Sequence, residues 1–152
     1  MSTYSVVGQN SFCSTPSLSK RWLRVAEQES RFFLVGAQEA LRHLATLQPD
    51  WDGAGSPMPM PGAIANASAR LPELYRVISL AGSWRMPHVS ASESGEVTFE
   101  WWSGNKKLTL YFDELHMEVI RVWGANINDE MKVIPLPHPT YFFDSWEWLN
   151  AH

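Results

Sequence analysis

The chain has 152 residues, of which 45% are hydrophobic and 12% aromatic, and its formal net charge is −4. This length matches a single domain, and the apolar content is too high for an intrinsically disordered chain. No apolar run reaches the roughly 20 residues of a membrane-spanning helix, residues 1–10 lack the pattern of a secretory signal, and one cysteine excludes an internal disulfide, so we expect a cytoplasmic protein.

Charge is distributed unevenly along the chain. Residues 1–48 carry five Lys/Arg and three Asp/Glu, whereas residues 86–152 carry four Lys/Arg and ten Asp/Glu. Nucleic-acid binders present a basic surface to the phosphates, so the acidic C-terminal half disfavours nucleic acid as a partner. An acidic surface instead suits a basic protein partner, and the alternative is that it only keeps the protein in solution.

The N-terminal part predicts an arm followed by helix. Residues 1–16 are rich in serine and lack periodicity, so we expect a flexible arm ahead of one domain over residues 17–152, with Ser17 as a candidate helix N-cap. The pattern drifts over residues 30–36, which leaves open one long helix or two, and Pro49 ends the segment. Apolar residues at helical spacing are Leu18, Trp22, Val25, Leu34, Ala37, Leu41, Leu44 and Leu47.

A turn-rich segment and a second helix follow. Residues 50–61 contain glycines and three prolines, which are incompatible with a helix or a central strand. Pro72 lies within the next helical pattern and predicts a kink or a break there. The apolar positions of this second helix are Ile64, Ala67, Leu71, Leu74 and Ile78.

After Gly82 the hydrophobic period changes to two, which is typical of strands. We expect strands over residues 97–102, 107–112 and 117–123, with further short strands over 87–90 and 132–136, and a terminal helix over 141–149. Helices that precede an antiparallel meander indicate an α+β fold. The predicted architecture is N-terminal helices packed on one face of a three- to five-stranded antiparallel β-meander, with a short C-terminal helix.

No catalytic or metal-binding motif is present in the sequence. The five histidines are scattered, no phosphate loop or nucleophile elbow occurs, and Cys13 lies in the predicted arm. We therefore predict a protein that is not an enzyme and has no cofactor and no catalytic or metal-binding residues. The alternative is a small metal-assisted hydrolase or nucleotide-processing enzyme that uses Asp52, Glu100 and a histidine, either His88 or His116.

The loop Trp51-Asp52-Gly53-x-Gly55 is the most individual local feature. In a structural interpretation, the glycines adopt positive φ, Asp52 accepts hydrogen bonds from the turn, and Trp51 fills the junction between helix and sheet. In a functional interpretation, Trp51 is exposed as a binding anchor.

This loop, the alanine-rich helix after it, Pro87-His88-Val89 and the segment 95–101 resemble a group of small bacterial and mobile-element proteins. Their pattern is Gly-Trp-Asp-Gly-x-Gly-Ala, a helix, a proline-containing link, and Asp-Gly-Gly followed by Glu-Trp in a sheet. The resemblance covers about residues 44–112, but Asp50 replaces the usual Gly, Ser56 the usual Ala, and Ser94-Gly95-Glu96 the Asp-Gly-Gly turn. The group has no established activity, so the resemblance supports the order of the elements and the origin of the chain more than a mechanism. Small accessory proteins of mobile elements are often inhibitors or immunity factors, and this association favours such a role.

The second face of the predicted sheet supplies the main functional hypothesis. If the helices cover the face of Phe99 and Leu110, then aromatic and charged residues share the other face and form an interface for another protein or for a homodimer. One alternative is that this face is covered by the C-terminal segment, which contains Phe142, Phe143, Trp146 and Trp148. Another is that the aromatic residues of the face bind sugars or peptides. The predicted partner-binding residues are Trp51, Asp52, Glu100, Trp102, Lys107 and Tyr111.

The predicted function is that of a protein-binding factor that acts by steric occlusion. The partner is expected to be a bacterial multi-subunit complex or a toxin, so that the chain is an inhibitor of a defence complex (anti-CRISPR-like) or an antitoxin-type protein.

Overall fold

The computed structural model describes residues 18–152, with some side chains between residues 18 and 30 left undescribed. The predictions for the arm 1–16, for Ser17 as an N-cap and for Cys13 lie outside the described residues. No helix in the described part of the chain is long and apolar enough to span a membrane.

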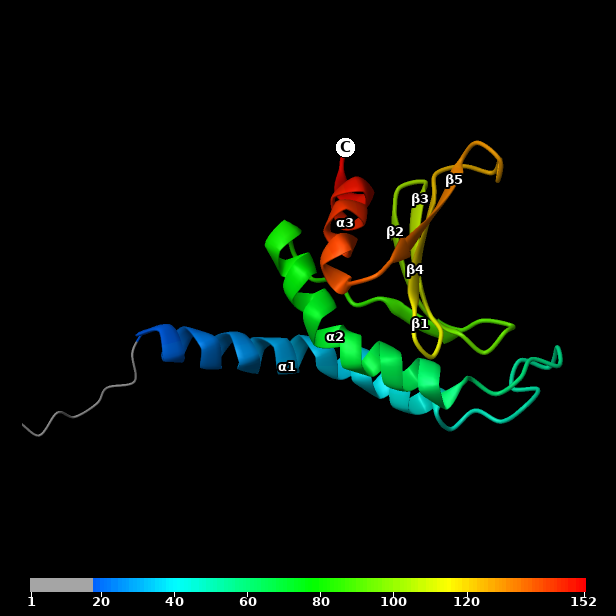
Figure 1. The fold of residues 1–152 in the computed structure, drawn as a ribbon, viewed down its shortest axis with the longest axis horizontal. Helices are drawn as coiled ribbons and strands as arrows, with labels where there is room; N and C mark the ends of the chain where they lie inside the picture. Colours follow the sequence, from blue (N-terminus) through cyan, green and yellow to red (C-terminus); the bar gives the residue numbers. More distant parts are fainter. Residues whose placement is uncertain (1–17) are drawn as a thin grey trace, which may run out of the picture.

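Helix α1 (Leu18–Leu44) is one continuous helix, which decides between the one-helix and two-helix alternatives. Its buried side chains are Leu34, Ala37, Leu41 and Leu44, whose spacing of three and four residues places them on one face. The helix ends before Pro49, as the sequence predicts. Its first part extends beyond the rest of the molecule (Figure 1).

Helix α2 (Pro61–Ala81) begins with a proline, which needs no hydrogen-bond partner in the first turn. Pro72 lies inside the helix without ending it, and the ribbon changes direction partway along its length (Figure 1), in accord with the predicted kink. The buried positions are Ala63, Ala67, Leu71, Leu74, Val77 and Ile78, while Ile64 is only partly buried.

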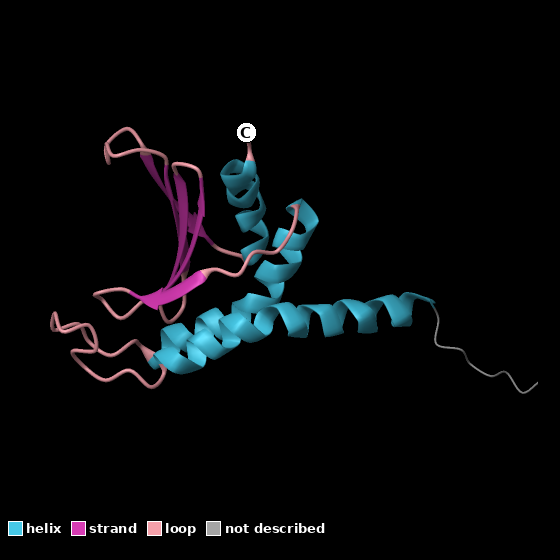
Figure 2. Ribbon diagram, turned by 180° about the vertical axis from the view of Figure 1, so that it is seen from behind, coloured by secondary structure: helices cyan, strands magenta, loops and turns pink. Residues whose placement is uncertain are grey.

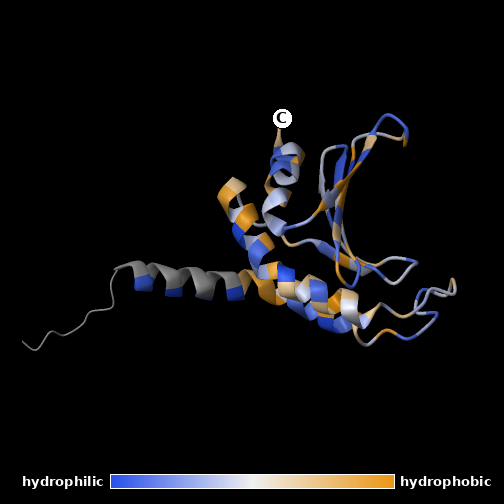
Figure 3. Ribbon diagram, viewed as in Figure 1, coloured by the Kyte–Doolittle hydropathy of each residue, from blue (hydrophilic) through white to orange (hydrophobic). Residues whose placement is uncertain are grey.

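Five antiparallel strands form one sheet in the order β1-β2-β3-β4-β5. This is the predicted meander with five strands. Hydrophobic and hydrophilic residues alternate along the strands, as Figure 3 shows, and this alternation gives the sheet two chemically different faces. The strands are β1 (His88–Ala91), β2 (Val97–Ser103), β3 (Lys106–Phe112), β4 (Met117–Val122) and β5 (Met131–Leu136).

The core lies between one face of the sheet and the helices. Phe99 pairs with Leu110, and Leu110 with Val119, and all three are fully buried. Helices α2 and α3 (Phe142–Asn150) pack on this face, and α1 packs along α2 (Figures 1 and 2). A short 3-10 helix (Pro139–Tyr141) leads from β5 into α3. The α+β fold with helices on one face of the meander is therefore confirmed.

Candidate functional site

The face of the sheet that points away from the helices carries polar, charged and aromatic side chains. We call it the open face, because no segment of residues 18–152 lies over it in either ribbon view (Figures 1 and 2). Strand alternation and register place on it His88 and Ser90 of β1, Thr98, Glu100 and Trp102 of β2, Lys107, Thr109 and Tyr111 of β3, Glu118, Ile120 and Val122 of β4, and Met131, Val133 and Pro135 of β5.

Four of the predicted binding residues share this face, and three of them are in direct contact. Trp102 and Lys107 are paired across β2 and β3. Lys107 Nζ lies 2.5 Å from Glu100 Oε1 and 5.5 Å from the centre of the Trp102 ring. The His88 ring lies 6.2 Å from the same indole. Trp102 is 49% exposed, so a large apolar side chain stands half uncovered between charged neighbours. Tyr111, the fourth residue, pairs with Thr98, which is four positions from Trp102 along β2.

The C-terminal segment packs on the helix face and leaves the open face uncovered. The Trp146 ring lies 5.5 Å from that of Trp101, at an interplanar angle of 83°, and Phe142 lies 5.5 Å from the same ring. Both α3 side chains are buried. The alternative in which this segment covers the second face is therefore not realised, although the segment does belong to the core.

Two cations of the sheet half, Arg121 and Lys106, are bound on the helix face, which leaves the open face acidic. Arg121 donates two hydrogen bonds to Ser145 Oγ, at 3.2 and 3.0 Å, and its guanidinium lies 5.4 Å from the centre of the Trp148 ring. Lys106 donates to two carbonyl oxygens at the end of α3, both at 2.9 Å. Lys107 is the lysine or arginine that remains on the open face, and it is already paired with Glu100.

A groove of about 580 Å³ lies at the end of the open face where β2 begins and β3 ends. Burial raises the pKa of Glu96 above its usual range, and the negative charges of Asp113 and Glu118 raise it further. The pKa of Tyr111 is also raised, mainly by burial. The lining residues are Glu96, Tyr111, Asp113, His116, Met117, Glu118, Pro135, Leu136 and Pro137.

The carboxylates of the groove differ in how far they are already bound. Asp113 accepts hydrogen bonds from the backbone N–H groups of Leu115 and His116, at 2.7 and 2.6 Å, and these bonds lower its pKa. Asp113 therefore caps the β3–β4 turn. Glu96 and Glu118 make no side-chain hydrogen bond or ion pair within the described residues, so they are the acceptors that the groove offers to a ligand.

Sequence reasoning did not include Glu96 or Glu118 in the candidate site. It applied strand alternation to residues 97–102 and 107–112 only. The same alternation also applies to residues 117–122. Together with the register of the hairpin, it places Glu118 opposite Tyr111. The signal was therefore present in the sequence, and Glu96 follows from it as the residue two positions before Thr98.

The loop with Trp51 and Asp52 is held by its own hydrogen bonds. Asp52 accepts from the backbone N–H groups of Ala54 and Ser56, at 3.0 and 3.3 Å, and from Ser56 Oγ at 2.5 Å. These bonds, led by that from the Ser56 hydroxyl, lower the pKa of Asp52. Trp51 Nε1 donates to the Pro57 carbonyl at 3.0 Å. The contacts of Asp52 are those of the structural interpretation, whereas the contact of Trp51 with Pro57 lies within the loop, and a role of Trp51 and Asp52 in binding stays a prediction.

The residues considered for a hydrolase lie in three different places. His88 is directly opposite Glu100 across β1 and β2, whereas His116 is in the β3–β4 turn beside Asp113. The side-chain hydrogen bonds of Asp52 stay inside its loop. Between residues 18 and 152, no three His, Cys, Asp or Glu side chains are arranged to hold a metal ion.

Comparisons of the chain with protein-family models, with curated proteins and with solved structures found no match. The open face itself is therefore the feature from which a function can be inferred. That face combines a half-exposed indole, an ion pair beside it, and a groove with two available carboxylates.

Proposed function

We propose that the chain is a protein-binding factor without catalytic activity, and that its open face docks on a basic surface of another protein. The observation that carries this proposal is Trp102, an indole that is 49% exposed on a sheet face that no part of residues 18–152 covers. Tryptophan is the residue type most typical of the few positions that dominate binding energy in protein interfaces.

The surroundings of Trp102 suit an interface that becomes desolvated on binding. His88 and Lys107 flank the indole, and Glu100 neutralises Lys107. Docking a partner here buries the ring without leaving a lone charge, because Lys107 brings its counter-ion with it. We therefore expect Trp102 to be the apolar anchor of the complex and the Glu100–Lys107 pair to set its orientation.

The groove explains why the partner is expected to be basic. Glu96 and Glu118 are available acceptors, and the Tyr111 ring lines the same groove. An arginine or lysine side chain of the partner can place its charge between these carboxylates and its apolar stem against Tyr111. Burial and then the repulsion among the carboxylates raise the pKa of Glu96 in the free protein, and such a cation also relieves that repulsion.

The class of partner follows from the resemblance to small bacterial and mobile-element proteins. It supports a bacterial multi-subunit complex or a toxin, which the chain would inhibit by covering a functional surface. Steric occlusion requires only a stable rigid surface and no chemistry, and a five-stranded sheet supported by helices supplies one.

Affinity capture from a bacterial lysate tests the proposal. We expect wild-type bait to retain a partner at low salt and to lose much of it at high salt, because exposed charges are screened. Trp102→Ala and Glu118→Lys baits should retain at least about tenfold less of the same partner.

Ile127→Ala is the matched control, because Ile127 is an exposed apolar residue (69%) in the β4–β5 loop, outside both the groove and the Trp102 cluster. It should retain the partner as wild type does. Equal retention by wild type, Trp102→Ala and Glu118→Lys would rule out the open face as the binding surface.

A further inference from the structure

A second exposed apolar surface lies at the opposite side of the molecule, where α1 leaves α2. Phe33 stacks on Tyr75 with ring centroids 6.1 Å apart, and Tyr75 contacts Trp84 at 5.4 Å. Phe32 lies 5.4 Å from Phe33. A Cβ placed on Gly36 would lie 2.7 Å from the sulfur of Met86, so Met86 packs directly on α1. We call Phe32, Phe33, Tyr75, Trp84 and Met86 the apolar corner.

The apolar corner is unusually exposed for residues of this type. Phe32 is 76% exposed, Met86 53% and Phe33 46%. Together the five side chains leave on the order of 400 Å² uncovered, given that one aromatic side chain alone buries roughly 150–250 Å² when fully covered. An exposed apolar area of this size marks an interaction surface. Trp84 Nε1 is in addition buried and without a hydrogen-bond partner in the described part of the chain.

The corner adjoins the first part of α1, whose described side chains are all exposed. Residues 18–33 of α1 form an overhang of about 24 Å beyond the body (Figures 1 and 2). Every side chain of this overhang that the structure describes is exposed, and buried positions begin only at Leu34. A helix of this length is marginally stable in water when nothing packs against it. The described side of the overhang and the corner are therefore both open to a covering surface.

We propose that a second copy of this chain supplies that surface, through antiparallel pairing of the two α1 overhangs. In this arrangement residue 18 of one copy lies opposite residue 33 of the other, so each overhang covers the apolar corner of its partner. Both unsupported surfaces are covered at once and identically in the two copies, which is the requirement for a two-fold symmetric dimer.

Area and charge both agree with a second copy as the occupant. In the dimer both corners are covered, so the two corners together bury on the order of 800 Å² of surface. The paired overhangs add further buried area, which brings the total above the ~1,000 Å² expected of a specific interface. The overhang is basic on its described side, with Lys20, Arg21, Arg24 and Arg31 exposed, as the hydrophilic lower edge in Figure 3 shows.

The end of α2 next to the corner is complementary to these cations. Its last turn has no basic residue to offset the negative end of the helix dipole. Antiparallel pairing brings Lys20 and Arg21 of one copy to the corner of the other, close to this helix end.

Sedimentation of the full chain tests the dimer. We expect wild type to dimerise at about 50 µM, a concentration at which a micromolar interface is saturated. Phe32→Glu should raise the dimer dissociation constant at least about tenfold, because it places a charge in each of two symmetric contacts. Ile127→Glu, at a position that is 69% exposed in the β4–β5 loop, is the matched control and should dimerise as wild type does. Circular dichroism should show that both variants keep the wild-type fold.

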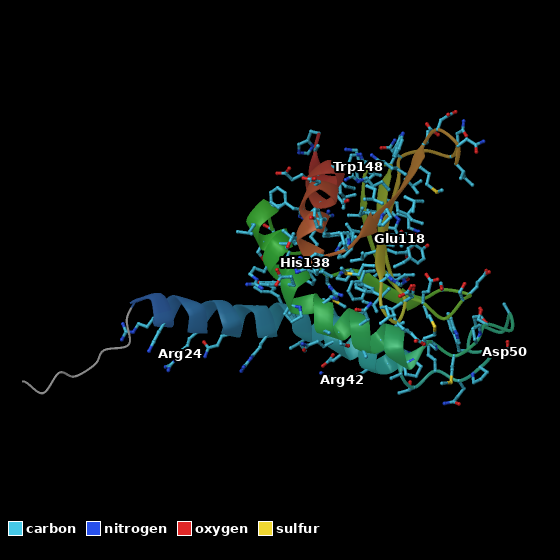
Figure 4. The ribbon with its side chains drawn as sticks, viewed as in Figure 1. Arg24, Arg42, Asp50, Glu118, His138 and Trp148 are labelled. Carbon is cyan, nitrogen blue, oxygen red and sulfur yellow. The ribbon has the colours of Figure 1, made fainter. Side chains whose placement is uncertain are left out.

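Spin-label distances test the geometry. Arg24 and Arg42 both point outward from α1 (Figure 4), and each can be replaced by a labelled cysteine in a Cys13→Ser background. Antiparallel overhangs predict a distance under about 30 Å between the two labels at position 24 and of about 50 Å or more at position 42.

A wild-type chain that stays monomeric at this concentration would refute the proposal, as would a dimer that Phe32→Glu leaves intact. A dimer in which the labels at position 42 are closer than those at position 24 would place the contact at the other end of the molecule and would also refute it. None of these outcomes affects the open face, whose capture experiment uses different residues.

Discussion

Trp101 and Trp102 are neighbours in β2, yet they lie on the two different sides of the sheet. Trp101 is 3% exposed, contacts Phe99, Phe142 and Trp146, and donates its indole N–H to the Arg85 carbonyl at 2.8 Å. Trp102 is 49% exposed and contacts His88 and Lys107. The comparison shows that composition alone does not distinguish core from interface in this chain, because aromatic residues serve both sides.

Charged residues show the same division. On the helix face, Lys106 and Arg121 bind acceptors of α3 and lie over the Trp148 ring. Figure 4 shows Trp148 between α3 and the sheet, whereas Glu118 lies on the other side. On the open face, a partly exposed ion pair and carboxylates that have no side-chain partner among the described residues meet solvent. We therefore expect changes on the helix face to affect the free energy of unfolding and equivalent changes on the open face to affect binding.

Removal of residues 141–152 should have the largest effect. It deletes Phe142, Trp146 and Leu149, all of which are buried. Loss of each such side chain costs about 2–5 kcal/mol, and a domain has only about 5–15 kcal/mol in total, so the shortened chain should be unfolded. Circular dichroism and urea titration measure this. A chain without His152 alone is the control, and a cooperative transition at the wild-type midpoint in the shortened chain would contradict the assignment of α3 to the core.

Replacing the two tryptophans separately makes the comparison quantitative. Trp101→Ala should lower the free energy of unfolding by about 3–5 kcal/mol, because it leaves a cavity among aromatic rings. Trp102→Ala should lower it by less than about 1 kcal/mol, since half of that ring is already in water. Urea titrations of both variants give the two values. If Trp102→Ala proves as destabilising as Trp101→Ala, then Trp102 is a core residue and the open face loses its anchor.

Two cations allow the same comparison with a smaller effect. Arg121→Ala removes two hydrogen bonds to the buried Ser145 hydroxyl and a contact with Trp148, and we expect a loss of about 1–3 kcal/mol. Lys107→Ala removes an ion pair in which the Lys107 side chain is 38% and that of Glu100 17% exposed, and it should cost less than about 1 kcal/mol. Urea titration at low and high salt measures both, and only the Lys107 effect should depend on salt. A strong salt dependence for Arg121→Ala would show that solvent reaches that site.

Most of the fold was predictable from local patterns. Alternation in residues 97–102 and 107–112 identifies β2 and β3 and assigns Phe99 and Leu110 to the buried face. Pro49, Pro61 and Pro72 locate the end of α1, the start of α2 and the bend within it. These signals are local, because they depend on backbone geometry and on burial of one side of an element.

The placement of elements relative to one another was less predictable. Nothing in residues 141–149 specifies which face of the sheet they cover, because Phe142 and Trp146 would suit either side. The groove required pairing residues about twenty positions apart, Glu96 with Glu118, through the register of two hairpins. The overhang of α1 was not predicted, because amphipathic spacing continues past the point where contact with the body ends.

The smallest effect concerns Glu96, whose pKa is raised by burial and by the neighbouring Asp113 and Glu118. A folded-state pKa above the unfolded value means that folding favours the protonated form. The stability contribution is then present at pH values below the ordinary glutamate pKa of about 4.3 and is lost as the pH rises above it. Glu96→Gln cannot ionise, so it avoids this decrease in the free energy of unfolding and should stabilise the protein at pH 7.

Because solvent screens exposed charges, the gain from Glu96→Gln should not exceed about 0.5 kcal/mol, and it should shrink with added salt. Glu147→Gln makes the same change in net charge on the outer side of α3, away from the groove, and should leave stability unchanged. Urea titrations between pH 4 and pH 7 measure the difference. If Glu96→Gln destabilises at pH 7, then Glu96 accepts a favourable interaction in the free protein. In that case the groove is not a binding site for a cation of the partner, and the open face must recognise its partner through Trp102 alone.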